Sequence, residues 1–364
     1  MGHALLDQYL TALAHAGGSD LHVKVGSPPR IRVNGVLQRI PGAEPLTPPV
    51  TAEMARSIMR DDVREHFDAT NEADFAYAIA DIGRFRANAF RQRGSTALIF
   101  RLVRGSAVTL DELGMPPVLE RLAGEHRGLV LVTGPTGSGK TTTLAAMIDW
   151  INRNREVHVI TIEDPIEVLH NDVQASVNQR EIGVDTSSFA NAMRAAMRQD
   201  PDVILVGEMR DQETVAAALS AAETGHLVLS TLHTIDASET INRIVDFFPP
   251  HQQNQIRVAL AGSLRGIVCQ RLVPTADGDG RVAAIEVMVN NGRTQNCILN
   301  PELTGEIHDI IADGEFYGMR TFDQSLIELL RAGKITLRQA MSAASNPHDM
   351  KLAMEKMGGV PAPV

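Results

Sequence analysis

The chain has 364 residues, of which 44% are hydrophobic, and its 44 Asp and Glu outnumber its 34 Lys and Arg, giving a net charge of −10. This length predicts two domains with aliphatic cores, and the acidic balance argues against a dedicated nucleic-acid binder, which usually carries a basic stripe. The sequence shows no run of about 18 apolar residues that would span a membrane and no signal peptide, so we expect a cytoplasmic protein that is peripheral to a membrane at most.

The first predicted domain covers residues 1–105 and combines helices with short strands. Apolar residues over 5–13 share one face of an opening helix, which ends at Gly17–Gly18. Asn34–Gly35 between two apolar stretches predicts a hairpin, and a second helix is expected near 51–66. The expected strands are 21–25, 31–33, 36–40, 75–79, 84–90 and 97–103. Together these elements predict a small α+β domain with an antiparallel sheet.

The second predicted domain, residues 118–345, follows a linker over 106–117 that contains Gly114 and the pair Pro116–Pro117. Residues 129–133 form a continuous apolar run, as expected of a buried parallel strand. Beyond about residue 235 we expect mostly helices, and residues 346–364 are expected to form a flexible tail. The earlier part alternates strands at 157–162, 203–206 and 227–231 with helices near 187–199 and 211–224. This alternation predicts a doubly wound α/β core.

A glycine-rich segment lies between the strand at 129–133 and an amphipathic helix. It reads Gly-Pro-Thr-Gly-Ser-Gly-Lys-Thr and fits the phosphate-binding pattern GxxxxGK[ST], not the GxGxxG pattern of dinucleotide-binding folds. In such a loop the backbone amides turn towards the phosphates, Lys140 reaches the β- and γ-phosphates, and the Thr141 hydroxyl ligates Mg²⁺. We therefore expect ATP and Mg²⁺ to bind at Gly134, Pro135, Thr136, Gly137, Ser138, Gly139, Lys140, Thr141 and Thr142.

Acids and histidines follow the other predicted parallel strands. Glu163 ends one strand and Glu208 follows another. Because the carboxyl ends of parallel strands meet at one sheet edge, both acids can face the γ-phosphate, one positioning water and one near the metal; the alternative is that they are helix caps. His226 opens and His233 closes a third strand. We place both at the same edge, with one or both reporting phosphate state, and with ordinary packing histidines as the alternative.

Taken together, these segments resemble the secretion-type AAA+-like ATPases, and most closely the type IV pilus retraction ATPases. The resemblance covers nearly the whole chain. Residues 18–35 are similar to that family's PAS-like N-terminal domain, and residues 318–326 are similar to the C-terminal part of retraction-type members. Between them, residues 160–167 are similar to its Asp box, 204–211 to its Walker B and 225–234 to its His box. The resemblance implies a RecA-like P-loop ATPase core preceded by a PAS-like domain.

The same resemblance implies a function and roles for single residues. It implies a homohexameric motor at the inner face of the cell membrane, which acts with an inner-membrane pilus platform protein to depolymerise pilin and drive twitching motility. Glu163 would be the base or water-orienting residue, and Glu208 the Walker B acid near Mg²⁺. Arginines of the first domain would reach the triphosphate. By position we choose Arg86 and Arg101, with ordinary sheet-surface cations as the alternative.

One segment departs from the family pattern. Retraction members carry a helix motif reading Ala-Ile-Arg-Asn-Leu-Ile-Arg-Glu, where this chain has Thr294–Glu302 and keeps only the general pattern. Three alternatives stay open: an extension or secretion ATPase of the same superfamily, a weakly hydrolysing accessory subunit, and a RecA-like DNA motor. Extension-type relatives usually carry a four-cysteine zinc module, which two cysteines cannot build, and the acidic balance disfavours the DNA motor.

Overall fold

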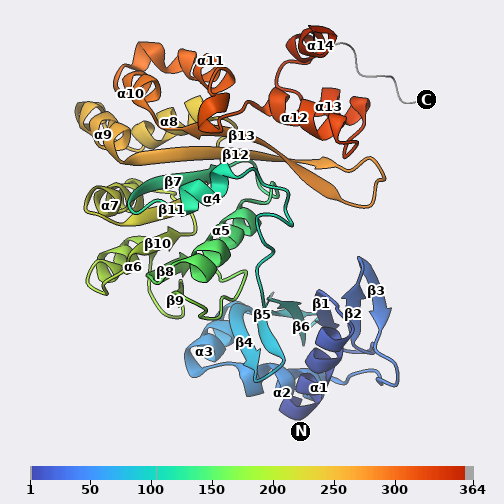
Figure 1. Cartoon of the computed structure of the whole chain (residues 1–364). Coiled ribbons are helices and arrows are strands. Elements are labelled where there is room, and N and C mark those ends of the chain that lie inside the picture. The colour runs from blue at the N-terminus through green and yellow to red at the C-terminus, as the bar shows by residue number, and fades with distance from the viewer. Residues whose placement is uncertain (1, 104, 357–364) are drawn as a thin grey trace. The chain divides into compact units, whose positions relative to one another are not determined.

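The computed structural model describes residues 2–103 and 105–356 and separates into two compact units (Figure 1). Unit 1 contains Met1–Ser106 together with Glu167–Leu169, and unit 2 contains Ala107–Ile166 and His170–Val364. The division after residue 106 falls at the start of the expected linker. Every helix in the described part of the chain is too short or too polar to cross a bilayer.

Unit 1 is a six-stranded antiparallel sheet in the order β3-β2-β1-β6-β5-β4, with helices packed on one face (Figure 1). The expected helix near 51–66 is in fact two helices. Met59 leaves the helical conformation and buries its side chain, and the next helix restarts with Asp61 and Asp62, whose charges favour a helix N-terminus. The elements are α1 (Gly2–His15), β1 (Asp20–Val23), β2 (Arg30–Val33), β3 (Val36–Arg39), α2 (Pro48–Ile58), α3 (Asp61–Thr70), β4 (Glu72–Ile79), β5 (Gly83–Gln92) and β6 (Ser95–Leu102).

The sheet of unit 1 has one apolar and one polar face. Phe85, Ala87 and Ala89 alternate along β5 and are buried under the helices, so the residues between them point to the opposite face. The predicted hairpin is confirmed: Val33 pairs with Val36, and the positive φ angles of Asn34 and Gly35 suit a tight turn.

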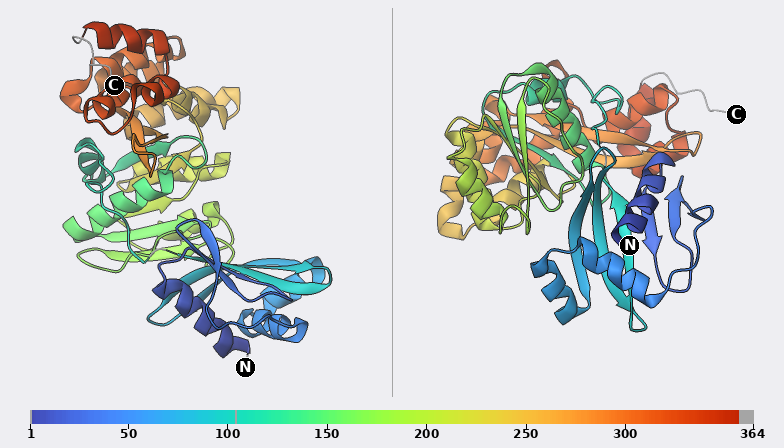
Figure 2. Two further views of the ribbon diagram at one scale, coloured as in Figure 1. Left: turned by 90° about the vertical axis from the view of Figure 1, so that its right-hand side faces the viewer. Right: turned by 90° about the horizontal axis from the view of Figure 1, so that it is seen from below.

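Unit 2 is built on a seven-stranded sheet in the order β13-β12-β7-β11-β10-β8-β9, in which only β13 runs antiparallel to its neighbour. Helices α4 and α5 cover one face, and α6 to α9 cover the other, as Figures 1 and 2 show. The predicted doubly wound α/β fold is therefore confirmed. The elements are α4 (Val118–Ala123), β7 (Gly128–Thr133), α5 (Lys140–Asn154), β8 (His158–Glu163), β9 (Ser176–Glu181), α6 (Phe189–Ala196), β10 (Val203–Val206), α7 (Gln212–Glu223), β11 (Leu227–Leu232), α8 (Ala237–Asp246), α9 (Pro250–Ser263), β12 (Leu264–Pro274) and β13 (Arg281–Val289).

The expectation of mostly helices beyond residue 235 is wrong for β12 and β13. Strand β12 lies between β7 and β13 and is buried over most of its length. A strand covered on both faces shows no polar alternation, so its sequence cannot be distinguished from a buried helix by periodicity. Strand β9 was also not expected, because this edge strand is largely polar.

The chain ends in a group of short helices that belong to unit 2 (Figure 2). Residues 347–356 form a helix although a flexible tail was expected over 346–364. Pro347 suits the first position of a helix, and the Met350 side chain is fully buried. Residues 357–364 lie outside the described part. The elements are α10 (Gly292–Leu299), η1 (Pro301–Glu306), α11 (Ile307–Ala312), η2 (Glu315–Tyr317), α12 (Phe322–Arg331), α13 (Leu337–Ala343) and α14 (Pro347–Lys356).

Candidate functional site

The predicted phosphate loop connects the carboxyl end of β7 to the first turn of α5. Gly139 stands at the N-cap of α5 with a φ of 93°, so no side chain covers the free amides of the helix N-terminus. The tip of the loop is exposed, whereas the Ser138 hydroxyl is buried and has no hydrogen-bond partner among the described residues. An uncapped helix end beside an unsatisfied buried hydroxyl fits the binding of phosphate oxygens.

Lys140 is folded back over the loop that precedes it. Its Nζ donates to the carbonyl oxygens of Gly134 at 2.7 Å and Pro135 at 3.1 Å, and the residue is only 8% exposed. Burial lowers the pKa of Lys140, and the negative charge of Glu208 acts against this shift. The ammonium group is therefore held at the loop mouth by two uncharged acceptors that a negatively charged phosphate can replace.

Gly134 is fixed by its surroundings as well as by its backbone conformation. Its φ is 144°, and a Cβ added there would lie 2.3 Å from the Gln270 carbonyl oxygen. We expect Gly134→Ala to lower the free energy of unfolding by more than the about 1–3 kcal/mol that backbone strain alone costs. The matched control is Gly225→Ala, which has a φ of 115° and nothing within 4 Å of the added Cβ. Equal unfolding midpoints for the two variants in denaturant would contradict the close approach.

Glu208 lies at the centre of a chain of polar contacts. Its Oε1 is 3.1 Å from His233 Nε2, and its Oε2 is 2.8 Å from Arg210 Nη2. His233 Nδ1 lies 3.5 Å from Lys140 Nζ. Burial by itself would raise the pKa of Glu208, but the hydrogen bonds and charges of Arg210 and His233 lower it below its usual range. Lys140, His233 and Glu208 therefore meet at one place, with Glu208 held as a carboxylate.

Glu163 is the last residue of β8 and is 8% exposed. Its Oε1 accepts hydrogen bonds from Thr161 Oγ1 at 2.6 Å and from Gln179 Nε2 at 3.1 Å. Strands β8 and β10 are direct neighbours with Ile162 paired to Val206, so Glu163 ends one strand and Glu208 lies just beyond the end of the next. The predicted meeting of the two acids at this sheet edge is what the structure shows.

His226 does not lie at this edge, and its expected placement there is wrong. Leu227, the next residue, pairs with the first residue of β7, whereas the phosphate loop follows the last residue of that strand. A strand of this length separates its two ends by roughly 20 Å. The His226 ring instead lies 3.0 Å from the Ala221 carbonyl oxygen at the end of α7. A residue that begins a parallel strand lies at the sheet edge formed by the amino ends of the strands, away from the phosphate loop.

The two candidate arginines belong to unit 1 and form a directly opposed pair on β5 and β6. Arg101 Nε donates to Asp20 at 2.9 Å. Arg86 Nη1 donates to Glu167 at 2.6 Å, and that glutamate groups with unit 1. The structure thus brings the two arginines together, in a different unit from the phosphate loop.

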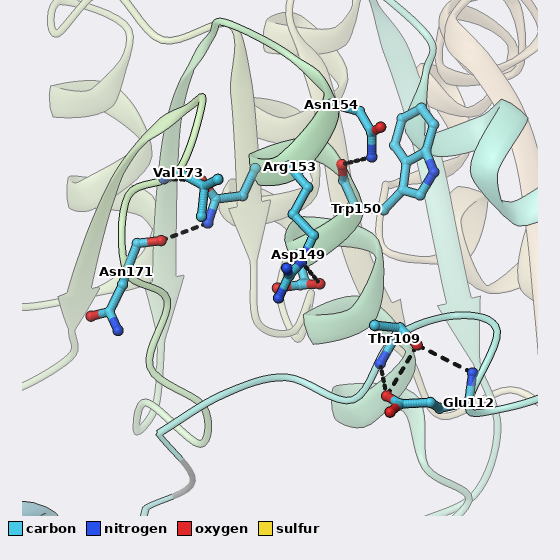
Figure 3. Close-up of polar contacts among 9 residues, drawn as sticks. Thr109, Glu112, Asp149, Trp150, Arg153, Asn154, Asn171 and Val173 are labelled. Atoms are coloured by element: carbon cyan, nitrogen blue, oxygen red, sulfur yellow. Dashed lines mark hydrogen bonds and ion pairs between the residues drawn. The ribbon is translucent and has the colours of Figure 1, made fainter.

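Helix α5 is anchored at the end opposite to the phosphate loop (Figure 3). Asn152 accepts from Val173 N at 3.0 Å and donates to the Asn171 carbonyl oxygen at 2.7 Å. Arg153 donates to the nearly buried Asp149 at 2.7 Å. The contacts of Asn152 tie the last turn of α5 to the loop after β8, whereas the Arg153–Asp149 pair lies within the helix.

Sequence reasoning missed three polar residues of this site. Arg210 contacts Glu208, and its position two residues further along the same segment could have indicated it. Gln179 holds Glu163 from the unexpected strand β9, and Gln270 on the unexpected strand β12 accepts a hydrogen bond from Thr143 at 2.8 Å. No local pattern marks either glutamine, because their strands were not predicted.

The donor set of the site fits magnesium. The described residues contain no group of three His, Cys, Asp or Glu that could hold a metal ion on its own. Mg²⁺ in nucleotide sites needs no such group, since it keeps several waters and takes one or two protein oxygens together with the phosphates. An exposed threonine at the start of α5, Thr141, and the carboxylate of Glu208 are donors of that kind.

Comparison with known proteins agrees with this geometry. The family model for type II/IV secretion system proteins matches residues 3–340. The chain is 43% identical to the type IV pilus retraction ATPase PilT of Pseudomonas aeruginosa over 94% of this chain and 99% of that protein. It is 45% identical to the twitching motility protein of Neisseria gonorrhoeae, over 88% of this chain and 86% of that protein.

A solved structure is similar over almost the whole chain. The crystal structure of the pilus retraction motor PilT with bound ADP matches with a TM-score of 0.86 and 44% sequence identity, covering 96% of this chain and 98% of that one. The chain belongs to the type II/IV secretion system protein family and is an ATPase.

Proposed function

We propose that this chain is an ATP-hydrolysing motor that powers type IV pilus retraction, working as a homohexamer on the cytoplasmic side of the cell membrane. The observation that supports hydrolysis is the contact of Lys140 and Glu208 with His233, with Glu163 at the end of the strand next to the one that Glu208 follows. The assignment to retraction is supported by relatives that share 43% and 45% identity and are named for pilus retraction and twitching motility.

In this proposal the loop binds the triphosphate and the neighbouring strand ends supply the chemistry. Lys140 exchanges its contacts with two backbone carbonyls for the β- and γ-phosphates. Thr141 and Glu208 would hold Mg²⁺, which neutralises part of the phosphate charge. Glu163, held through Oε1 by Thr161 and Gln179, orients the attacking water or accepts its proton. His233, between Lys140 and Glu208, responds to the occupancy of the site through both of them.

A cavity of about 780 Å³ in unit 2 suits the remainder of the nucleotide. It opens beside Gly139 and Thr142 and is bordered by the linker at Asp111–Met115 and by the turn between β12 and β13. Small-molecule sites typically enclose about 300–1,000 Å³. We assign the ribose and the base to this cavity, which puts the triphosphate at the N-terminus of α5.

The arginines of unit 1 supply the argument for a ring. Positive groups that stabilise the transferred phosphoryl are often provided in trans, and Arg86 and Arg101 are carried by a different unit from the phosphate loop. We propose that unit 1 of one copy completes the site of the next copy, which requires an oligomer. The inner-membrane pilus platform protein is the proposed partner of the assembled ring.

Deletion of the gene in the bacterium that carries it tests the proposed function. We expect excess surface pili that fail to retract and a loss of twitching motility, because pilin subunits are no longer returned to the membrane. Complementation with the wild-type gene should restore both, and complementation with Lys140→Ala should restore neither. A mutant without surface pili would instead indicate extension or secretion, and would contradict the proposal.

A further inference from the structure

Four charged residues form one row across the polar face of the sheet in unit 1. Asp20 on β1 is directly opposite Arg32 on β2 and Arg101 on β6, and Arg101 is in turn opposite Arg86 on β5. Directly opposed residues of an antiparallel sheet project to the same face. The row therefore reads Arg32, Asp20, Arg101, Arg86, with a single acid among three arginines.

Asp20 is the buried member of this row. Its side chain is 8% exposed, whereas that of Arg101 is 65% exposed. Asp20 Oδ1 accepts from Arg101 Nε at 2.9 Å, and Oδ2 accepts from Ser19 Oγ at 2.7 Å and lies 3.8 Å from Arg32 Nε. Burial alone would raise the pKa of Asp20, but the hydrogen bonds of Ser19 and Arg101 and the charge of Arg101 lower it. The carboxylate stays ionised, and it is carried by a residue whose backbone is fixed in strand β1.

The contact with Arg101 uses the inner nitrogen of the guanidinium group. An arginine held at Nε keeps both terminal amino groups for a bidentate contact with a phosphate. Arg86 differs, since its Nη1 is the atom engaged by Glu167. Of the two candidate arginines, Arg101 is therefore the one whose reach and orientation are set in advance by a fixed carboxylate.

We propose that Asp20 is a positioning residue for ATP hydrolysis, which orients Arg101 towards the triphosphate of the neighbouring copy. This inference rests on the proposed function, in which Arg101 acts in trans. An ion pair with so exposed an arginine contributes little to the stability of the fold. The ion pair instead orders the Arg101 side chain before the nucleotide binds, so that binding does not have to restrict this side chain.

Asp20→Asn in the full-length oligomer tests this role. The amide still accepts a hydrogen bond at Oδ1 but no longer carries the charge that holds the guanidinium group. We expect kcat for ATP hydrolysis to fall about 10- to 100-fold, as for other partners that orient a reactive group, with a small change in KM. Asp74→Asn is the matched control on the same sheet: Asp74 is exposed and accepts from Asn88 at 2.9 Å, and its replacement should leave kcat unchanged.

The decisive comparison repeats Asp20→Asn in an Arg101→Ala background, measured in single turnover so that slow rates are resolved. If Asp20 acts through Arg101, the double variant hydrolyses ATP as fast as Arg101→Ala alone. An equal fold-loss in both backgrounds would overturn the positioning role, as would an unchanged kcat for Asp20→Asn. Full activity of Arg101→Ala itself would remove the proposed role of that arginine, a failure of the proposed function that this experiment distinguishes from a failure of the inference.

Thermal unfolding provides the structural readout. We expect Asp20→Asn and Asp74→Asn to unfold at similar temperatures and to form oligomers of the same size. A large drop in the unfolding temperature for Asp20→Asn alone, together with a loss of oligomer, would show that Asp20 serves the fold of unit 1 and would overturn the proposal.

Discussion

Lys140→Ala should reduce ATP hydrolysis by about 10²–10³-fold or more, the loss typical for removal of a group that stabilises developing charge in a water-poor site. Lys140 is the cation held at the mouth of the phosphate loop, where its Nζ bonds two carbonyl oxygens and lies near His233. Without it, the phosphate loop offers the β- and γ-phosphates backbone amides and hydroxyl groups but no positive charge of its own. The measurement is phosphate release by the purified oligomer at saturating ATP.

The control for Lys140→Ala is Lys351→Ala, an exposed lysine on α14, which should hydrolyse ATP at the wild-type rate. Nucleotide affinity should also fall for Lys140→Ala, because the charge contacts the ground state as well as the transition state. Wild-type turnover in Lys140→Ala would remove the assignment of this loop as the hydrolytic site.

The phosphate loop and the α/β class could be predicted because both depend on local patterns. Residues 129–133 are continuously apolar, and Gly134–Thr141 carries its glycines at fixed spacing, so strand, loop and helix follow from neighbouring residues alone. The convergence of Glu163 and Glu208 needed one further rule, that parallel strands end at the same edge. The catalytic roles of these residues remain predictions.

What could not be predicted depends on partners far away in the sequence. Strand β12 is buried over most of its length because β7 and β13 pair with its two edges and helices cover its two faces. Its Gln270 reaches the phosphate loop only through the pairing of β12 with β7. His226 was misplaced because a histidine at the start of a strand was treated like one at its end. Asp20 looks like an ordinary polar residue before a strand until the register puts Arg101 opposite to it.

Glu163→Gln should separate nucleotide binding from hydrolysis. The substitution keeps the size of the side chain and an oxygen that can accept from Thr161 and Gln179, but it removes the negative charge that orients and deprotonates water. We expect kcat to fall about 10²–10⁴-fold, the usual contribution of a general base, while the affinity for ATP is retained. The measurements are phosphate release and binding of a fluorescent ATP analogue by the same preparation.

Glu181→Gln is the matched control for Glu163→Gln, because it makes the same change one strand away. Glu181 is directly opposite Glu163 in the pairing of β8 with β9, is 5% exposed, and accepts from Ile166 N at 3.2 Å. A loss caused by disturbing this buried edge of the sheet would affect both variants, whereas loss of the base affects Glu163→Gln alone. Wild-type turnover in Glu163→Gln would contradict this role and would assign the activation of water to another group, such as Glu208 beyond the end of the neighbouring strand β10.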